Sequence, residues 1–426
     1  MKKWLFLLLI SCFASAQNTR WTDYFSYFNV KYISAEDRIL YCAAENGLFS
    51  YNLITGEIQK ISKVNGLHEV KITAFAQNTE KGKMLIGYEG GKLDVVDDSG
   101  IHLIIDIPID QNFQGDKSIN DIYTEGDYAV LSMNFGVLLF NLDKLEFKET
   151  CFFQQGASYF PVKKAVIYNN QVFAASTNGL YSHTIDGMFP NFLAWTLSAG
   201  GNISQTAKNN STLLYESGGN LFKSQEGTFW QNVGYYPNLQ DIVSAEENIL
   251  LVESNNVTVL NSNLNIIGSN SYTENLNTAA LFDGKLYAGT QLRGIFDGVN
   301  YIAPDGPFSN ISYSINIAEN QLWIAPGGRD AAYNAPSYFA NGYYHFDGSR
   351  WKHITDDDMN IPDDYLNESN GYPYPFVMQI VPNPSNIKET YVMSYSNGLI
   401  KMTDDVFTAR YNRDNSPIPQ WERITG

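Results

Sequence analysis

Five histidines are the residues from which metal binding or acid–base chemistry would start: His68, His102, His183, His345 and His353. None of them belongs to a His-Glu-x-x-His motif, and the chain has no Gly-x-Ser-x-Gly turn that would present a nucleophilic serine. The spacing of His345 and His353 would let them approach each other across adjacent strands of one sheet. We interpret all five as structural or exposed side chains, with a metal site as the less favoured alternative.

A run of acidic residues near the C-terminus is the second candidate for chemistry. Its six carboxylates belong to Asp356, Asp357, Asp358, Asp363, Asp364 and Glu368. Calcium favours oxygen ligands, but the alternating ligand spacing of a calcium loop is missing, so a solvated insertion is the favoured interpretation and calcium stays open. No spacing selects a carboxylate pair for glycoside hydrolysis. The sequence therefore predicts no catalytic, cofactor-binding or metal-binding residue, no cofactor, and a protein that is not an enzyme.

One phrase repeats between Ala43 and Ile295: an apolar run, a polar turn that usually ends in glycine, and a second apolar run. The turns are Asn46-Gly47, Gly90-Gly91, Phe135-Gly136, Asn178-Gly179, Gly218-Gly219, Asn255-Asn256 and Arg293-Gly294. Such turns supply the positive φ angles of tight hairpins. Their spacing is close to the roughly 40 residues of a four-stranded blade. The chain is thus predicted to be all-β, with a seven-bladed β-propeller whose innermost strands precede the hairpins.

The ends of this propeller are less regular. After Phe296 the chain enters a turn-rich segment, residues 300–307, so the sequence pattern predicts no outer strand for the seventh blade from this segment. We expect the residues around Trp21 to supply that strand and close the ring, which would remove exposed sheet edges. Trp195 and Trp230 are expected on outer strands, where their rings pack in the core.

Beyond Pro307 the pattern resumes with longer insertions and predicts two more blades. The outer strand of the second one is expected at residues 420–423, around Trp421. Two blades do not close a ring, because propellers have at least four. The predicted domains are a signal peptide at 1–16, a seven-bladed propeller at 17–306, and the start of a second, truncated propeller at 307–426. The first propeller is expected to unfold as one unit and the remainder to fray.

The N-terminus indicates export. Lys2 and Lys3 precede an apolar stretch that ends in Ala14-Ser15-Ala16, as in a secretory signal peptide cleaved before Gln17. A lipoprotein box that leaves a lipid on Cys12 is the alternative. No later segment has the length and apolarity of a transmembrane helix. The other cysteines, Cys42 and Cys151, are interpreted as buried small hydrophobic residues.

Composition narrows the possible partners. The formal net charge of -17 argues against nucleic acid, whose phosphates would repel the chain, and against adsorption to an anionic membrane surface. The 28 tyrosines suit strands that pack blade against blade, while sugar stacking stays open for a minority.

Several sequence segments, taken in their order along the chain, resemble those of the PorZ family of the type IX secretion system. They are Trp21-Thr22-Asp23-Tyr24, the exit 302–307, the strand 322–328, Tyr344-His345-Phe346-Asp347-Gly348, and 380–384 followed by Ser394-Tyr395-Ser396-Asn397-Gly398-Leu399. The resemblance covers essentially the whole mature chain. It implies two seven-bladed propellers and a C-terminal sorting domain in the complete protein. It also implies a place at the cell surface, peripheral to the outer membrane.

The resemblance further implies a role without catalysis. The family belongs to the attachment complex with the sortase-like PorU and the outer-membrane barrels PorV and PorQ, which anchors cargo to anionic lipopolysaccharide. No family site is carried onto residues of this chain. The alternative is the extracellular sensor propeller of a hybrid two-component regulator, since such sensors also repeat Asn-Gly-Leu hairpins. A glycan-processing propeller enzyme ranks third, because fold alone does not supply catalysis.

Overall fold

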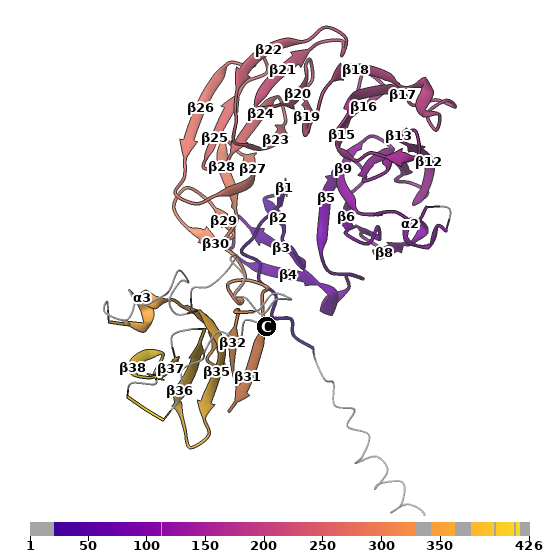
Figure 1. The fold of residues 1–426 in the computed structure, drawn as a ribbon. Coiled ribbons are helices and arrows are strands. Elements are labelled where there is room, and N and C mark those ends of the chain that lie inside the picture. The colour runs from indigo at the N-terminus through magenta and orange to yellow at the C-terminus, as the bar shows by residue number, and fades with distance from the viewer. Residues whose placement is uncertain are drawn as a thin grey trace, which may run out of the picture.

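The computed structural model describes residues 21–111, 113–328, 342–362, 376–395, 398–412 and 415–417. The predicted signal peptide, Cys12, Asp363, Asp364, Glu368 and Trp421 lie outside these residues. Nine four-stranded antiparallel sheets and one two-stranded ribbon account for the regular structure of the described residues, with only short helices between them. Figure 1 shows seven of the sheets arranged around one axis and the last two side by side below them. The predicted all-β class is confirmed.

Each sheet of the ring is built from four consecutive strands. The first three sheets comprise β1 (Tyr32–Glu36), β2 (Ile39–Ala43), β3 (Gly47–Asn52) and β4 (Ile58–Ser62); β5 (Ile72–Asn78), β6 (Lys83–Tyr88), β7 (Leu93–Asp97) and β8 (Gly100–Ile104); and β9 (Ile119–Glu125), β10 (Tyr128–Met133), β11 (Gly136–Asn141) and β12 (Glu146–Phe152). The next two comprise β15 (Val162–Tyr168), β16 (Gln171–Ser176), β17 (Gly179–Thr184) and β18 (Thr196–Gly200); and β19 (Gln205–Lys208), β20 (Leu213–Ser217), β21 (Asn220–Ser224) and β22 (Gln231–Tyr235).

The ring ends with two further sheets. They comprise β23 (Leu239–Ala245), β24 (Asn248–Glu253), β25 (Asn256–Leu260) and β26 (Ile266–Ser271); and β27 (Leu276–Phe282), β28 (Lys285–Thr290), β29 (Ile295–Phe296) and β30 (Tyr301–Ile302). The first strands of neighbouring sheets contact one another all the way round, including β1 with β27. They are therefore the innermost strands, as predicted. All seven predicted turns join the second and third strands of a sheet.

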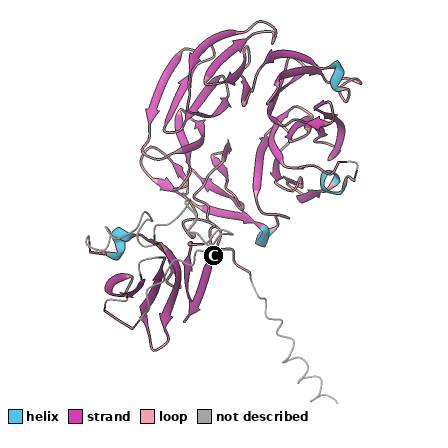
Figure 2. Cartoon of the chain, in the orientation of Figure 1, coloured by secondary structure: helices cyan, strands magenta, loops and turns pink. Residues whose placement is uncertain are grey.

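The remaining elements are small and lie between or outside the blades. They are the ribbon β13 (Gln154–Gln155) and β14 (Ser158–Tyr159), the 3-10 turns η1 (Lys63–Asn65) and η2 (Phe192–Ala194), and the one-turn helices α2 (Asp106–Ile109) and α3 (Asp356–Met359). Figure 2 shows these helical turns as isolated cyan segments in connections between strands. No helix of the described residues is long and apolar enough to cross a membrane.

A tight backbone approach explains one of the turn glycines. Gly136 has a φ of 145°, and a Cβ atom there would lie 2.0 Å from the carbonyl oxygen of Cys151 on the neighbouring strand. Only glycine tolerates both conditions, because it has no Cβ to clash. The sequence signal that predicted this hairpin thus has a steric cause.

The prediction that residues around Trp21 close the seventh blade is wrong. That sheet is completed by β30, which occupies the edge of β29 and leaves no place for another strand. Residues 21–30, which we call the N-terminal strap, contain no strand, and Trp21 is 79% exposed. The strap contacts the seventh sheet elsewhere, since the Gly294 N–H donates to the Phe28 carbonyl at 2.7 Å and the Val30 N–H donates to the Thr290 carbonyl at 3.0 Å. The ring closes by packing of β1 against β27.

Two sheets follow the ring and pack against each other. They comprise β31 (Ser314–Ala318), β32 (Gln321–Ala325), β33 (Tyr343–Phe346) and β34 (Trp351–Ile354); and β35 (Val377–Asn383), β36 (Asn386–Ser394), β37 (Gly398–Thr403) and β38 (Val406–Tyr411). Their first strands contact each other, as in the ring, and their side chains share an apolar core around Trp323 and Tyr343. This arrangement matches the first blades of a second propeller.

The outer strand of the ninth sheet differs from the prediction at residues 420–423. β38 takes that position, directly after a turn formed by Asp404 and Asp405. Both turn residues have positive φ angles, 50° and 64°, as a two-residue hairpin requires. The sequence pattern missed this hairpin because aspartate pairs signal it less clearly than Asn-Gly.

Aromatic and cysteine side chains behave as predicted within the ring. Cys42 and Cys151 are both buried and unpaired. Trp195 packs in the core shared by the third and fourth sheets. The Trp230 Nε1–H donates to the Ser198 carbonyl at 3.0 Å, which ties the fifth sheet to the outer strand of the fourth.

The strap is anchored on the first sheet by a buried carboxylate. Asp23 accepts hydrogen bonds from the hydroxyl of Ser62 at 2.6 Å, the ammonium of Lys60 at 3.0 Å and the hydroxyl of Tyr27 at 3.2 Å. Burial and the neighbouring Asp23 charge raise the pKa of Tyr27, so this phenol stays a donor. Three donors to one carboxylate make this a strong attachment point.

The other side of the strap contacts the connection to the last two sheets. The Ser26 N–H donates to the side-chain oxygen of Asn310 at 2.8 Å, and the Ser26 hydroxyl donates to the Phe308 carbonyl at 3.0 Å. Tyr24 packs against Phe346 and Trp351 with ring centroids 5.3 and 5.5 Å away. The strap thus lies between the ring and the eighth sheet and holds both.

Replacing Asp23 by alanine should destabilise this joint. The change leaves Ser62 and Tyr27 without their acceptor in a buried environment, so we expect a loss of about 2 kcal/mol in unfolding free energy and faster proteolysis near residues 303–310. Urea unfolding and limited proteolysis measure these effects. Lys63→Ala is the matched control, because its pair with Glu69 is exposed and 3.5 Å long. Equal stability of the two variants would contradict the role given to Asp23.

Candidate functional site

An ion pair joins the innermost strands of the fourth and sixth blades. Lys164 of β15 places its ammonium 2.6 Å from a carboxylate oxygen of Asp241 on β23, and it also donates to Gln205 of β19 at 3.3 Å. The second carboxylate oxygen of Asp241 accepts from the Thr278 hydroxyl of β27 at 2.9 Å. These bonds connect the fourth, fifth, sixth and seventh sheets. We call Lys164, Asp241, Asp121 and Tyr32 the axial cluster.

The axial cluster carries one carboxylate more than it has cations. Burial raises the pKa of Asp121 on β9 to about 6, Lys164 opposes this shift, and the charge of Asp241 adds to it. Burial alone would lower the pKa of Lys164, but Asp241 and Asp121 raise it, so the ammonium stays charged. Burial and the two carboxylates also raise the pKa of Tyr32. Asp121 is therefore the group of the cluster that changes charge near neutral pH.

The axial cluster predicts a pH-dependent difference between the wild type and Asp121→Asn. Because the folded-state pKa of Asp121 is raised, the folded state binds this proton more tightly, and stability is lost as pH rises from about 4 to about 6. The variant should lack this loss and be more stable at pH 7, on the order of 2 kcal/mol. Chemical unfolding from pH 4 to 8 gives the difference. A variant less stable than the wild type at pH 7 would show that the carboxylate is needed in its charged form.

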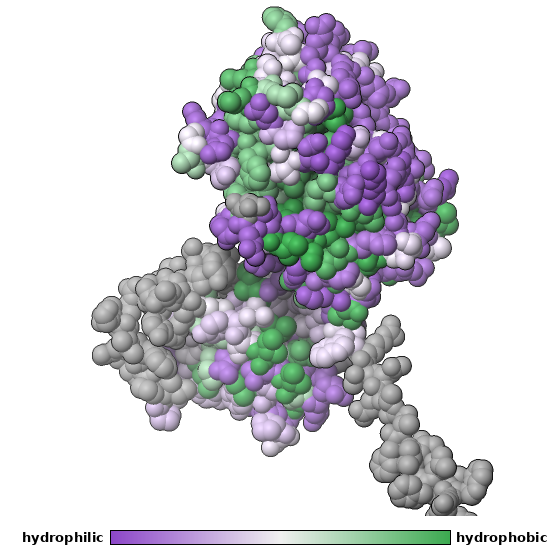
Figure 3. Space-filling model, turned by 90° about the vertical axis from the view of Figure 1, so that its right-hand side faces the viewer, coloured by the Kyte–Doolittle hydropathy of each residue, from purple (hydrophilic) through white to green (hydrophobic). Residues whose placement is uncertain are grey.

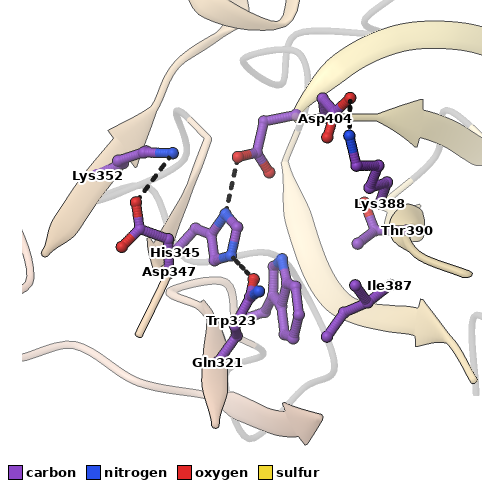
Figure 4. Close-up of a pocket in the computed structure, with 10 residues that line it drawn as sticks. Gln321, Trp323, His345, Asp347, Lys352, Ile387, Lys388, Thr390 and Asp404 are labelled. Atoms are coloured by element: carbon purple, nitrogen blue, oxygen red, sulfur yellow. Dashed lines mark hydrogen bonds and ion pairs between the residues drawn. The ribbon is translucent and has the colours of Figure 1, made fainter. Parts of the chain in front are cut away.

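A second polar site lies between the eighth and ninth sheets (Figure 4). It surrounds a cavity of about 260 Å³, which we call the inter-sheet cavity. Its lining comes from Gln321 and Trp323 of β32, His345 of β33, Asp347, Lys352 of β34, Ile387, Lys388 and Thr390 of β36, and the turn residues Asp404 and Asp405. The two walls therefore belong to different sheets.

His345 joins these two walls. Its Nδ1 lies 2.7 Å from Asp405, its Nε2 lies 2.9 Å from the side-chain oxygen of Gln321, and its ring stacks on Trp323 at 4.6 Å. The hydroxyl of Tyr343 donates to the other oxygen of Asp405 at 2.7 Å. Burial would raise the pKa of Asp405, but the bonds from His345 and Tyr343 outweigh it and lower the pKa. Asp405 is thus held as an anion between two donors.

The two C-terminal histidines do not meet, so that expectation is wrong. The strand register pairs His345 with Lys352 and His353 with Tyr344, which puts the two imidazoles on opposite faces of the sheet. His353 stacks on Phe308 instead, at 4.1 Å.

The other three histidines have local partners: His68 with Asp94 at 2.7 Å, His102 with Asp97 at 3.1 Å and His183 with the Thr184 carbonyl at 2.6 Å.

The structure describes part of the acidic run. Asp356, Asp357 and Asp358 belong to α3, whose first turn is capped by Thr355 in a reciprocal bond with Asp358. This capping gives Asp358 a local structural role, because a carboxylate at this position stabilises a helix N-terminus. Within the described ranges, no group of three or more His, Cys, Asp or Glu side chains is arranged to hold a metal ion. Gln321 and Asp405 were not found from the sequence. Pairing of β32 with β33 brings Gln321 to His345, and packing of the ninth sheet against the eighth brings Asp405 there.

The outer side of the ring near the second sheet exposes apolar residues. Ile105 is 41% and Ile109 is 62% exposed, and Leu103 of β8 is 37% exposed. Figure 3 shows this side of the ring as a largely hydrophilic surface that hydrophobic side chains interrupt. The segment from β8 to α2 is thus a candidate contact surface.

Asp405→Asn should loosen the last two sheets. The amide keeps the turn geometry, because asparagine tolerates positive φ, but it loses the charged bonds to His345 and Tyr343, at a cost of about 2 kcal/mol. The Asp405 pKa is lowered in the folded state, so its contribution is present above the unfolded pKa and is lost as pH falls through the folded value. Hydrogen exchange over β31–β38 reports the effect.

The neighbouring Asp404→Asn is the control for this change. Asp404 is exposed and its pair with Lys388 is 3.5 Å long, so exchange should stay within error of the wild type. Identical protection in both variants would remove Asp405 from the contact between the sheets.

The fold defines the class of the protein: seven consecutive four-stranded sheets around one axis are a seven-bladed β-propeller, followed by two blades of the same construction. Residues 40–196 match the family model described as "TSS9, PorZ, N-terminal beta-propeller domain". The resemblance to the PorZ family is confirmed by this match.

One solved structure supports this fold. The structure of PorZ from Porphyromonas gingivalis, described as an essential bacterial surface component of the type-IX secretion system, superposes with a TM-score of 0.78 at 15% identity. The match covers 94% of this chain and 54% of PorZ, so the chain spans about half the length of that relative. The WD40 repeats of RRP9 give a TM-score of 0.49 at 10% identity, over 62% of this chain and 88% of theirs. No curated protein sequence matches the chain.

Proposed function

We propose that the chain is a non-enzymatic cell-surface component of the type IX secretion system. In this role it takes part in the attachment complex with the sortase-like PorU and the barrels PorV and PorQ. It contributes to assembly of that complex and to maturation and anchoring of cargo on anionic lipopolysaccharide. The observation that carries the proposal is the match of residues 40–196 to the PorZ N-terminal propeller.

The polar contacts inside the ring support a scaffolding role for the protein. The Lys164 ammonium and the Asp241 carboxylate bind each other and residues on neighbouring innermost strands, which makes them part of the framework. The histidines of the ring are likewise bound to residues of their own blade. Surfaces of such a ring, including the apolar segment from β8 to α2, are then the parts available to protein partners.

Deletion of the gene in the source bacterium tests this function. Cargo proteins should accumulate with their sorting domains uncleaved and without attached lipopolysaccharide, and the wild-type gene should restore both steps. Immunoblots of cell-surface fractions measure them. Normal cargo processing in the deletion strain would refute the proposal.

The same deletion strain distinguishes the proposed secretion role from the sensor alternative. A sensor propeller predicts altered transcription with cargo processing intact. Affinity capture of the tagged full chain from outer-membrane extracts should recover PorU, PorV and PorQ, and an equally abundant tagged surface protein serves as the control.

A further inference from the structure

A buried donor lines the inter-sheet cavity without an acceptor. Trp323 is 1% exposed, and its indole N–H has no hydrogen-bond partner among the described residues. Figure 4 shows the indole nitrogen directed toward the space between His345 and Thr390. An unsatisfied buried N–H is costly and rare in folded proteins. This cavity therefore offers a hydrogen bond that the protein itself does not use.

Thr390 contributes a second, poorly satisfied polar atom from the opposite wall. The residue is 3% exposed, and within the described part of the chain its hydroxyl has no hydrogen-bond partner of ordinary length and angle. Burial raises the pKa of the Tyr343 phenol, and a weaker hydrogen bond with Thr390 opposes this rise without satisfying the threonine fully. The neighbouring Tyr343 hydroxyl donates to Asp405 instead. An indole N–H on β32 and a hydroxyl on β36 thus face one cavity from two sheets.

The acceptors of the lining, in contrast, are largely occupied. Asp347 accepts from the Ser349 N–H at 3.0 Å, the Ser349 hydroxyl at 2.6 Å and the Arg350 N–H at 3.1 Å. Asp405 accepts from Tyr343 and His345. The buried polar atoms of the lining that remain poorly satisfied, the Trp323 N–H and the Thr390 hydroxyl, can both donate, so the cavity suits a ligand with acceptor atoms.

Two ammonium groups add charge to these donors. Lys352 pairs with Asp347 at 3.3 Å and Lys388 pairs with Asp404 at 3.5 Å, and the two lysine side chains are 44% and 67% exposed. Such loose, exposed pairs are weak and exchange readily for another anion. The carboxylates of Asp347, Asp404 and Asp405 limit how much negative charge the cavity accepts, which disfavours a dianion such as phosphate.

We propose that the inter-sheet cavity binds a small monocarboxylate. The carboxylate would accept from the Trp323 N–H and the Thr390 hydroxyl and face the two lysines. Ile387 and the indole supply apolar surface for a short alkyl or aryl group, and about 260 Å³ is space for a small molecule. The site belongs to the two C-terminal sheets and does not depend on the secretion role of the chain.

Fluorine NMR of the full chain labelled with 5-fluorotryptophan tests the site directly. The Trp323 signal is identified by its loss in Trp323→Phe. Benzoate should shift this signal saturably, whereas benzamide, a neutral molecule of the same shape, should not. A cavity that holds only water would show no saturable shift, and this outcome would overturn the proposal, as would equal binding of benzamide.

Variants measured by calorimetry give the second test. Trp323→Phe keeps the aromatic ring and removes the N–H, so the Kd for benzoate should rise about tenfold. Thr390→Val, which keeps the side-chain shape, should weaken binding in the same direction and supports the test if the tryptophan variant does not fold. Lys401→Gln is the control, because Lys401 pairs with Glu389 and does not line the cavity. Unchanged benzoate affinity in both cavity variants would place the binding elsewhere.

Discussion

Side-chain packing of β1 against β27 is the contact on which the ring depends. Every blade is made from four consecutive strands, so no strand is shared between the first and the last sheet. Closure therefore has no backbone ladder of its own. It rests on this packing, on the two strap hydrogen bonds from Val30 and to Phe28, and on the bonds that the Asn277 side chain donates to Asn29 and Val30. A sheet edge left open at this point would invite pairing with another chain.

Much of the ring was predictable because its signals are local. The hairpin turns mark the junction of the second and third strands in all seven blades, and glycine at such positions has the steric cause seen at Gly136. The closing strand was misassigned for the same reason. β30 is only two residues long, Tyr301–Ile302, and lies within a turn-rich segment where no hydrophobic alternation is visible. Its pairing with β29 depends on the tertiary structure, which a local sequence pattern does not encode.

The polar sites were not predictable, because each is assembled across sheets. Lys164 meets Asp241 only when the fourth and sixth blades face one axis, and His345 meets Asp405 only when two sheets stack. The spacing of these residues in the sequence does not indicate such contacts. The two sites also differ physically. In the axial cluster Lys164 and Asp241 bind each other and one carboxylate is in excess, whereas the inter-sheet cavity keeps a buried donor without an acceptor among the described residues.

Because of the position of the strap, the order in which the chain segments are synthesised differs from the order in which they assemble. Each blade needs only its own segment of chain, and such local contacts form quickly. The strap is made before any blade, yet its partners include Thr290, Phe308 and Trp351, hundreds of residues later. Its contacts through Asp23 need only the first sheet, but its docking is complete only after the seventh blade and the start of the eighth exist. The first described residues of the chain are therefore among the last to reach their final place, and their docking marks a completed ring.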